Sequence, residues 1–286
     1  MNWFHDIIII NLKIKGVVKL TNTDSSLSQK TSWQVINIFA FLLVIIVNGL
    51  ANILPLGGNT TGELSDLYPN LFTPAGLTFS IWGVIYLALA AFIVYQARDL
   101  LSKQKIKMPY LQAISGYFLL SCLANAGWIF AWHYRHVLLS LVAMLVLLFS
   151  LIMIYLNLDI GRKRVEPPIL YFVHLPFSLY LGWITVATIA NITAVLVNYQ
   201  WSGWGFSEIF WTVLVILAGT VITFINIFQR GDIAYSVVIL WAYLGIIIKR
   251  YSVSSQPIMT IVYVTGLAMV LIVIGIVFFR KKAVKA

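Results

Sequence analysis

Eight apolar stretches, each about long enough to cross a lipid bilayer as a helix, constrain this chain more than any other feature. The hydrocarbon core of a bilayer is roughly 30 Å thick, and about 20 helical residues span it. Only 10% of the residues are charged, which is too few for the polar coat of a soluble globule of 286 residues. We therefore predict an all-α integral membrane protein. The expected spans are Trp33–Leu54, Pro74–Gln96, Tyr110–Trp132, Val137–Leu158, Ile169–Val197, Glu208–Phe228, Ile233–Ile248 and Pro257–Phe279.

Basic residues are distributed unevenly between the segments that connect these spans. If successive spans alternate in direction, sixteen of the 19 Lys and Arg residues fall on one face of the membrane and three on the other. Because Lys and Arg collect in cytoplasmic loops, we expect a multi-pass membrane protein with both termini in the cytoplasm. The same asymmetry accounts for the formal charge of +10 without a nucleic-acid partner. Residues 1–32 are expected to form a polar cytoplasmic arm.

The longest connection expected on the outer face is residues 55–73, with the sequence PLGGNTTGELSDLYPNLFT. Its Gly and Pro residues favour turns over a regular helix. Long irregular loops at a surface often cover a binding site. The composition is equally consistent with a lid over a site and with a plain connector.

Uncharged polar and aromatic side chains inside the spans are the candidates for a site. At 1.5 Å per residue, Trp82 lies about 12 Å below the outer end of its span, and Asn125 comes out at a similar depth. Residues three or four apart, such as Asn125 and Trp128, share one helix face. Four of the first five spans carry such groups: Asn48, Trp82, Tyr86, Asn125, Trp128, Trp183, Thr185 and Asn191.

Two explanations of these residues remain open from the sequence. Asn, Thr and small residues can join membrane helices by hydrogen bonds and close packing. Aromatic rings with a few amides can instead line a pocket for a planar apolar ligand with a polar rim. An interfacial aromatic belt is expected to include Trp132, Trp201 and Trp204, whereas Trp82 and Trp183 lie too deep for it.

Three segments resemble the TspO/MBR family, also called the translocator protein or tryptophan-rich sensory protein family. Residues 72–86, FTPAGLTFSIWGVIY, are similar to the start of its second helix. Residues 125–128, NAGW, resemble the Asn-x-x-Trp pattern of its third helix. Residues 183–191, WITVATIAN, resemble the pattern of its fifth helix. The resemblance covers about residues 33–197 and lies in the expected order along the chain.

The resemblance implies a five-helix bundle with a pocket near the loop between its first two helices. Members of this family bind tetrapyrroles such as protoporphyrin, sterols or synthetic aromatic molecules. By position, Trp82, Asn125, Trp128 and Trp183 would line the pocket, with Phe72 and Pro74 entering from the loop. No cofactor is required on this interpretation, and a porphyrin or haem-like molecule would be the ligand.

The predicted organisation is a cytoplasmic arm (1–32), a TspO/MBR-like five-helix membrane domain (33–197) and additional C-terminal transmembrane helices (198–286). The resemblance implies a ligand-binding or sensory protein of a bacterial plasma membrane, whose partners are the lipid bilayer and a small hydrophobic ligand. The alternative is a transporter of a small lipophilic solute. An enzyme acting on a bound pigment would need an acid–base constellation that the sequence does not supply. The sequence leaves open the role of the last three spans, which could form a homodimer, shield a face of the bundle or extend the pocket.

Overall fold

The structure, a computed structural model, describes residues 28–51, 53, 56–253 and 258–285. These residues form helices and connections without strands, and eight helices are long and apolar enough to cross a membrane. The predicted all-α membrane fold is confirmed. The spans are the first helix (Ser28–Ala51), η2–α3 (Gly76–Ser80 and Ile81–Ala97), α4 (Pro109–His133), α5 (Val137–Asn157), α6–η3–α7 (Pro167–Ile169, Leu170–His174 and Leu175–Asn198), α8 (Glu208–Arg230), α9 (Ile233–Ile248) with η5 (Lys249–Val253), and α10 (Met259–Lys285).

The expected cytoplasmic arm is too long by at least five residues. Residues 1–27 lie outside the described residues, but residues 28–32 already belong to the first helix. Lys30, which was counted with the arm, is 5% exposed and forms an ion pair with Asp99. A charge can be included in the end of a membrane helix when a partner of opposite sign is buried with it.

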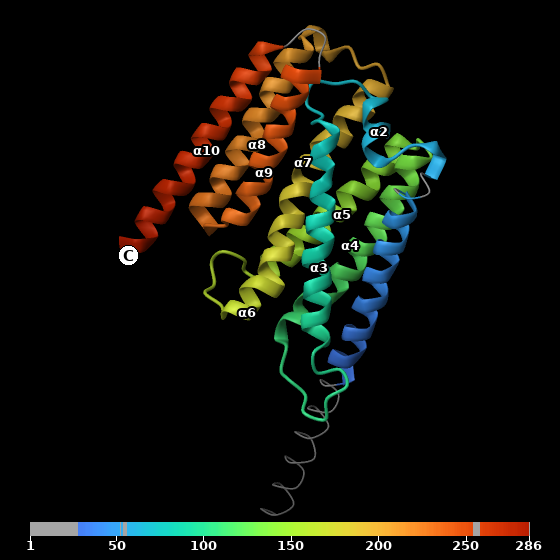
Figure 1. Cartoon of the computed structure of the whole chain (residues 1–286), viewed down its shortest axis with the longest axis vertical. Coiled ribbons are helices and arrows are strands. Elements are labelled where there is room, and N and C mark those ends of the chain that lie inside the picture. Colours follow the sequence, from blue (N-terminus) through green and yellow to red (C-terminus); the bar gives the residue numbers. More distant parts are fainter. Residues whose placement is uncertain (1–27, 52, 54–55, 254–257, 286) are drawn as a thin grey trace, which may run out of the picture.

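Five helices form a bundle at one side of the molecule (Figure 1). In this bundle α4 packs against α5, α5 against α7, and α7 against α3. The first helix closes the group through side-chain hydrogen bonds, because Gln34 reaches the Gln96 carbonyl of α3 and Asn48 reaches Asn125 of α4. Buried rings from three helices, Phe92, Phe118 and Phe177, pack in its interior with centroids 5.2–6.0 Å apart.

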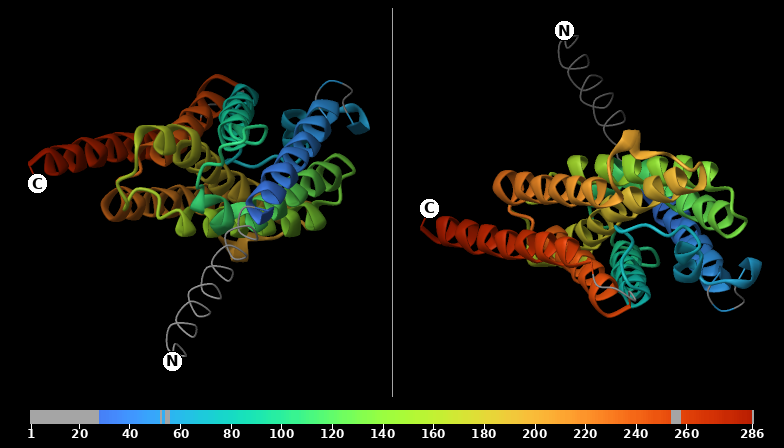
Figure 2. Two further views of the ribbon diagram at one scale, coloured as in Figure 1. Left: turned by 90° about the horizontal axis from the view of Figure 1, so that it is seen from below. Right: turned by 90° about the horizontal axis from the view of Figure 1, so that it is seen from above.

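The remaining helices, α8, α9 and α10, pack on one another and lie beside the bundle (Figures 1 and 2). Of these three, α9 has the most extensive contact with the bundle, through α7 and η2. A glycine allows the close approach to α7, since a Cβ on Gly182 would lie 3.0 Å from the Val238 Cβ. Tyr235 Oη also donates a hydrogen bond to Thr185 Oγ1 across this interface, at 3.1 Å.

The connection between the first two spans is a folded segment with its own short helices, η1 (Leu56–Gly58) and α2 (Thr61–Asp66). The Thr60 hydroxyl accepts from the Glu63 N–H, and the Glu63 carboxylate accepts from the Thr60 N–H at 2.7 Å. This capping box fixes the start of α2, and its hydrogen bonds hold the pKa of Glu63 below the ordinary value. α2 packs on the end of α4 and on η2, so it lies against one end of the bundle.

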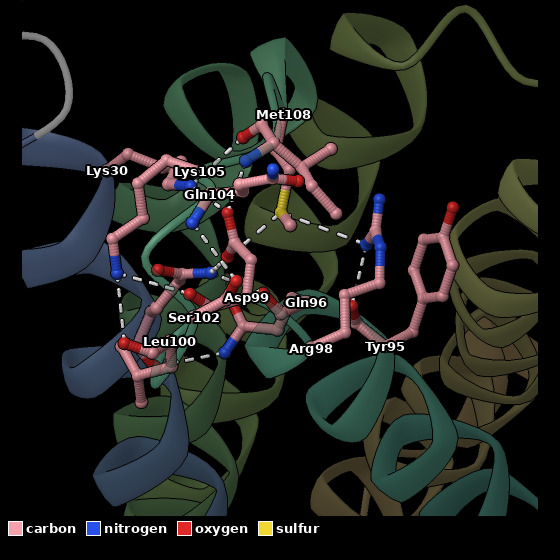
Figure 3. A network of polar contacts seen from close by, with 12 residues as sticks. Lys30, Tyr95, Gln96, Arg98, Asp99, Leu100, Ser102, Gln104, Lys105 and Met108 are labelled. Carbon is pink, nitrogen blue, oxygen red and sulfur yellow. Dashed lines mark hydrogen bonds and ion pairs between the residues drawn. The ribbon is translucent and has the colours of Figure 1, made fainter.

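At the opposite end of α3, a buried polar network joins the first helix to the loop after α3 (Figure 3). Asp99 is 1% exposed, pairs with Lys30, and accepts from Gln34 Nε2 at 2.8 Å and from the Ile106 N–H at 2.6 Å. Burial raises the pKa of a carboxyl group, but these donors outweigh that effect and bring the pKa of Asp99 to about 2. We call these residues, with Asn37, Gln96 and Ser115, the Asp99 network.

Candidate ligand-binding site

Trp82 lies at the centre of an aromatic cluster beneath the α2 end of the bundle. Its ring stacks on Tyr86 with centroids 5.4 Å apart and an interplanar angle of 21°. Rings of α4 and α7 surround the other sides, with Trp128, Tyr180 and Trp183 at 6.0, 6.0 and 6.1 Å. Four of these five rings were predicted as site residues, and the structure brings them together. Tyr180 was missed, although it lies three residues before Trp183 and therefore on the same helix face.

Two cavities adjoin this cluster. A small one of about 40 Å³ is enclosed by Thr61, Ser65, Thr73, Pro74, Phe79, Trp82, Trp128, Trp132, Trp183, Val186, Ala187, Ala190, Asn191 and Ala194. A groove of about 740 Å³ runs between the first helix and α3, lined by Ile45, Asn48, Gly49, Thr60, Thr61, Gly62, Glu63, Asp66, Gly76, Phe79, Ser80, Trp82, Gly83 and Tyr86. Trp82, Phe79 and Thr61 line both, so they form the partition between them.

Two tryptophans that line the small cavity carry buried hydrogen-bond donors. The indole nitrogens of Trp128 and Trp183 are buried, and neither finds a partner among the described residues. The two side chains are only 5% and 2% exposed. A third tryptophan of the same wall, Trp132, does have an acceptor, because its Nε1 donates to the Thr61 carbonyl at 3.3 Å. A buried donor that stays unpaired costs about 1–3 kcal/mol, so such groups call for an explanation.

The predicted amide side chains connect helices through hydrogen bonds, and some of them also line the two cavities. Asn125 is fully buried, accepts from Asn48 Nδ2 at 2.8 Å and donates to Tyr180 Oη at 2.9 Å. It lines neither cavity and links the first helix, α4 and α7. Asn48 also lines the groove, and Asn191 lines the small cavity while donating to Ser140 Oγ at 3.0 Å. Asn125 therefore only connects helices, whereas Asn48 and Asn191 connect helices and also line a cavity.

Three sequence-based assignments are corrected by the structure. Thr185 faces α9 and not the cavity, because two residues along a helix rotate it by about 200° from Trp183. Phe72 is 1% exposed and packs in the core beneath the loop, while its neighbours Thr73 and Pro74 reach the cavity. Trp132 was assigned to the interfacial belt but is 5% exposed, stacks with Trp128 at 6.1 Å and lines the cavity.

The small residues of the α7 wall were not predicted as site residues. Ala187, Ala190 and Ala194 follow Trp183 by four, seven and eleven residues, which is the spacing of a single helix face. That stripe was visible in the sequence. The lining contributed by α2, Thr61 and Ser65, was not, because the position of a loop depends on contacts with distant helices.

The fold and this site define a class, the polytopic membrane proteins whose helices enclose an aromatic-lined cavity. Within that class, the model of the TSPO-like protein family matches residues 34–278, and the chain belongs to this family. The match is wider than the predicted resemblance and includes α8, α9 and nearly all transmembrane residues of α10. No curated protein and no solved structure matches the chain.

Proposed function

We propose that this protein binds a flat hydrophobic molecule of the tetrapyrrole type in the groove between the first helix and α3. The proposal rests on the volume of this groove and on the aromatic side chains that form one of its walls. Its volume of about 740 Å³ lies within the range of roughly 300–1,000 Å³ usual for small-molecule sites. The stacked pair of Trp82 and Tyr86 forms one wall, and flat conjugated rings pack well against such a surface.

Polar groups at two places would orient the ligand. Asn48 from the first helix and Thr60 from the loop line the groove itself. For the unpaired indole N–H groups of Trp128 and Trp183 to take part, a carboxylate or carbonyl substituent of the ligand has to pass from the groove into the small cavity, between the residues that line both. The cavity of about 40 Å³ has room for only a few heavy atoms, which suits a substituent and not a macrocycle.

Titration of the detergent-purified protein with protoporphyrin, followed by quenching of tryptophan fluorescence, tests the proposal. Trp82→Ala removes the stacking wall, and we expect its dissociation constant to rise at least about tenfold. Trp204→Ala is the matched control, because Trp204 is 75% exposed and packs with Trp201 and Trp211, outside both cavities. Equal affinities in the two variants would refute binding in this groove.

Binding and transport differ in their time course. In sealed vesicles containing the protein, a binder takes up ligand in proportion to the amount of protein and then stops. A transporter continues to accumulate ligand in the lumen over time. We expect the first behaviour, because the stacked rings of Trp82 and Tyr86 offer the groove a surface for binding a flat molecule.

A further inference from the structure

The segment that joins α2 to α3 has two faces. We call residues 73–79 the 73–79 segment. It begins with irregular backbone and ends within the short helix η2 (Gly76–Ser80). On one face, Thr73, Pro74 and Phe79 line the small cavity. On the other face, Ala75 and Thr78 lie against α9, which belongs to the group of three C-terminal helices.

One backbone–backbone and one side chain–backbone hydrogen bond join the 73–79 segment to α9. The Ala75 N–H donates to the Gly245 carbonyl at 3.0 Å, and Trp241 Nε1 donates to the Thr78 carbonyl at 2.9 Å. Irregular backbone within a membrane protein has to find such partners, since lipid offers none. An ion pair between Lys249 and Asp66, at 2.5 Å, joins the end of α9 to α2 as well.

Glycine at position 245 allows this contact. A Cβ on Gly245 would overlap with Thr78 Oγ1 and would lie 2.9 Å from both Thr78 Cβ and Pro74 Cβ. These neighbours belong to the same short segment, so even one methyl group requires the segment to move. Pro74 lines the small cavity, and Gly76 and Phe79 of the same segment line the groove, so a shift of the segment changes the walls of both.

We propose that α9 is a positioning element of the ligand site, in which Gly245 and Trp241 set the place of the 73–79 segment and thereby the shape of the cavity. The three C-terminal helices are then part of the binding site and not a separate module. This inference rests on the proposed function for its effect on ligand affinity. Its structural half, the dependence of the 73–79 segment on α9, can be measured without any ligand.

Gly245→Ala tests the inference, and Gly266→Ala is the matched control. Both exchange a glycine inside a C-terminal membrane helix, and alanine favours a helix at either position by about 1 kcal/mol. A Cβ at Gly266 meets nothing within 4 Å. We expect Gly245→Ala to raise the dissociation constant for protoporphyrin about tenfold, and Gly266→Ala to leave it unchanged. Trp241→Phe keeps a ring but removes the bond to Thr78, and should weaken binding to a smaller extent.

Amide hydrogen exchange of the ligand-free protein supplies the independent readout. In Gly245→Ala, exchange should accelerate in residues 70–80 and stay unchanged in residues 98–108 at the other end of α3. Unchanged exchange in residues 70–80 would overturn the inference, whatever the ligand data show. Faster exchange with unchanged affinity would also overturn it, because the segment would then move without affecting the site. If the wild-type protein binds no porphyrin, the proposed function fails, and the exchange measurement still decides whether α9 positions the segment.

Discussion

The two ends of α3 are held in different ways. At the Asp99 end, a buried ion pair and several hydrogen bonds connect the helix to its neighbours, and both charges have partners. At the α2 end, rings dominate, two cavities interrupt the packing, and two buried indole donors find no acceptor among the described residues. The helix is thus fixed at one end and incompletely packed at the other.

The proposed ligand binding would require such a difference. A site for an absent ligand has to keep empty volume and unpaired polar groups, and both reduce the free energy of unfolding. The cost is tolerable when other parts of the fold are stable. In this protein the Asp99 network at one end of α3 and the contacts of α9 at the other supply that support.

The largest effect is expected from breaking the buried ion pair. Lys30→Met leaves the Asp99 carboxylate buried without its cation, which typically costs about 3–5 kcal/mol. Thermal or denaturant unfolding in detergent measures this loss. Lys103→Met, on the exposed part of the same loop, is the control and should change stability by less than about 0.5 kcal/mol. Equal stability of the two variants would show that the Asp99 end is not the stable end.

Acid should weaken the Asp99 end before it affects the aromatic end. The pKa of Asp99 is about 2 in the folded protein and roughly 3.9 in an unfolded chain. The paired carboxylate therefore contributes roughly 2–3 kcal/mol, which is fully present above about pH 5 and is lost as the pH falls through 4 to 2 and below. Unfolding measured between pH 6 and pH 3 should show this decline. Asp99→Asn should reduce the slope, and an identical slope in that variant would contradict the assignment.

The sequence predicted the stable features of the fold better than it predicted the site. Long apolar stretches have one physical solution in a bilayer, so the spans agree with the helices to within a few residues except at the start of the first. The Asp99 network escaped notice, although Lys30, Gln34 and Asn37 follow one another by four and three residues and share a helix face. Their polarity in an otherwise apolar helix was the available signal.

Helix rotation explains most of the errors at the site. A residue type and its depth can be inferred from the chain, but the direction in which a side chain points depends on packing against distant helices. Thr185 bonds to Tyr235 of α9, and nothing near Thr185 in the sequence indicates that helix. Likewise, the division of the space between a groove and a small cavity depends on where Trp82 and Phe79 meet the loop.

At the aromatic end, removing an unpaired donor should affect affinity more than stability. Trp183→Phe keeps an aromatic ring but deletes an N–H for which the described residues offer no acceptor. We expect protoporphyrin to bind about tenfold more weakly, or about 1.4 kcal/mol. Trp132→Phe deletes an N–H that donates to Thr61, and should lose about 1 kcal/mol more stability than Trp183→Phe. Unfolding and titration of both variants test this, and equal stability losses would argue against a free donor at Trp183.

The smallest effect is expected where α9 meets α2. Lys249 and Asp66 form an ion pair, but the Asp66 side chain is 59% exposed, so solvent and salt weaken the attraction. Lys249→Met should lower the free energy of unfolding by less than about 1 kcal/mol in dilute buffer, and the difference from wild type should shrink in 1 M salt. Lys163→Met, in an exposed position between α5 and α6, should show no such salt dependence. A large, salt-independent loss in Lys249→Met would mean that charge pairing at the α2 end matters as much as it does around Asp99, and the contrast between the two ends of α3 would no longer hold.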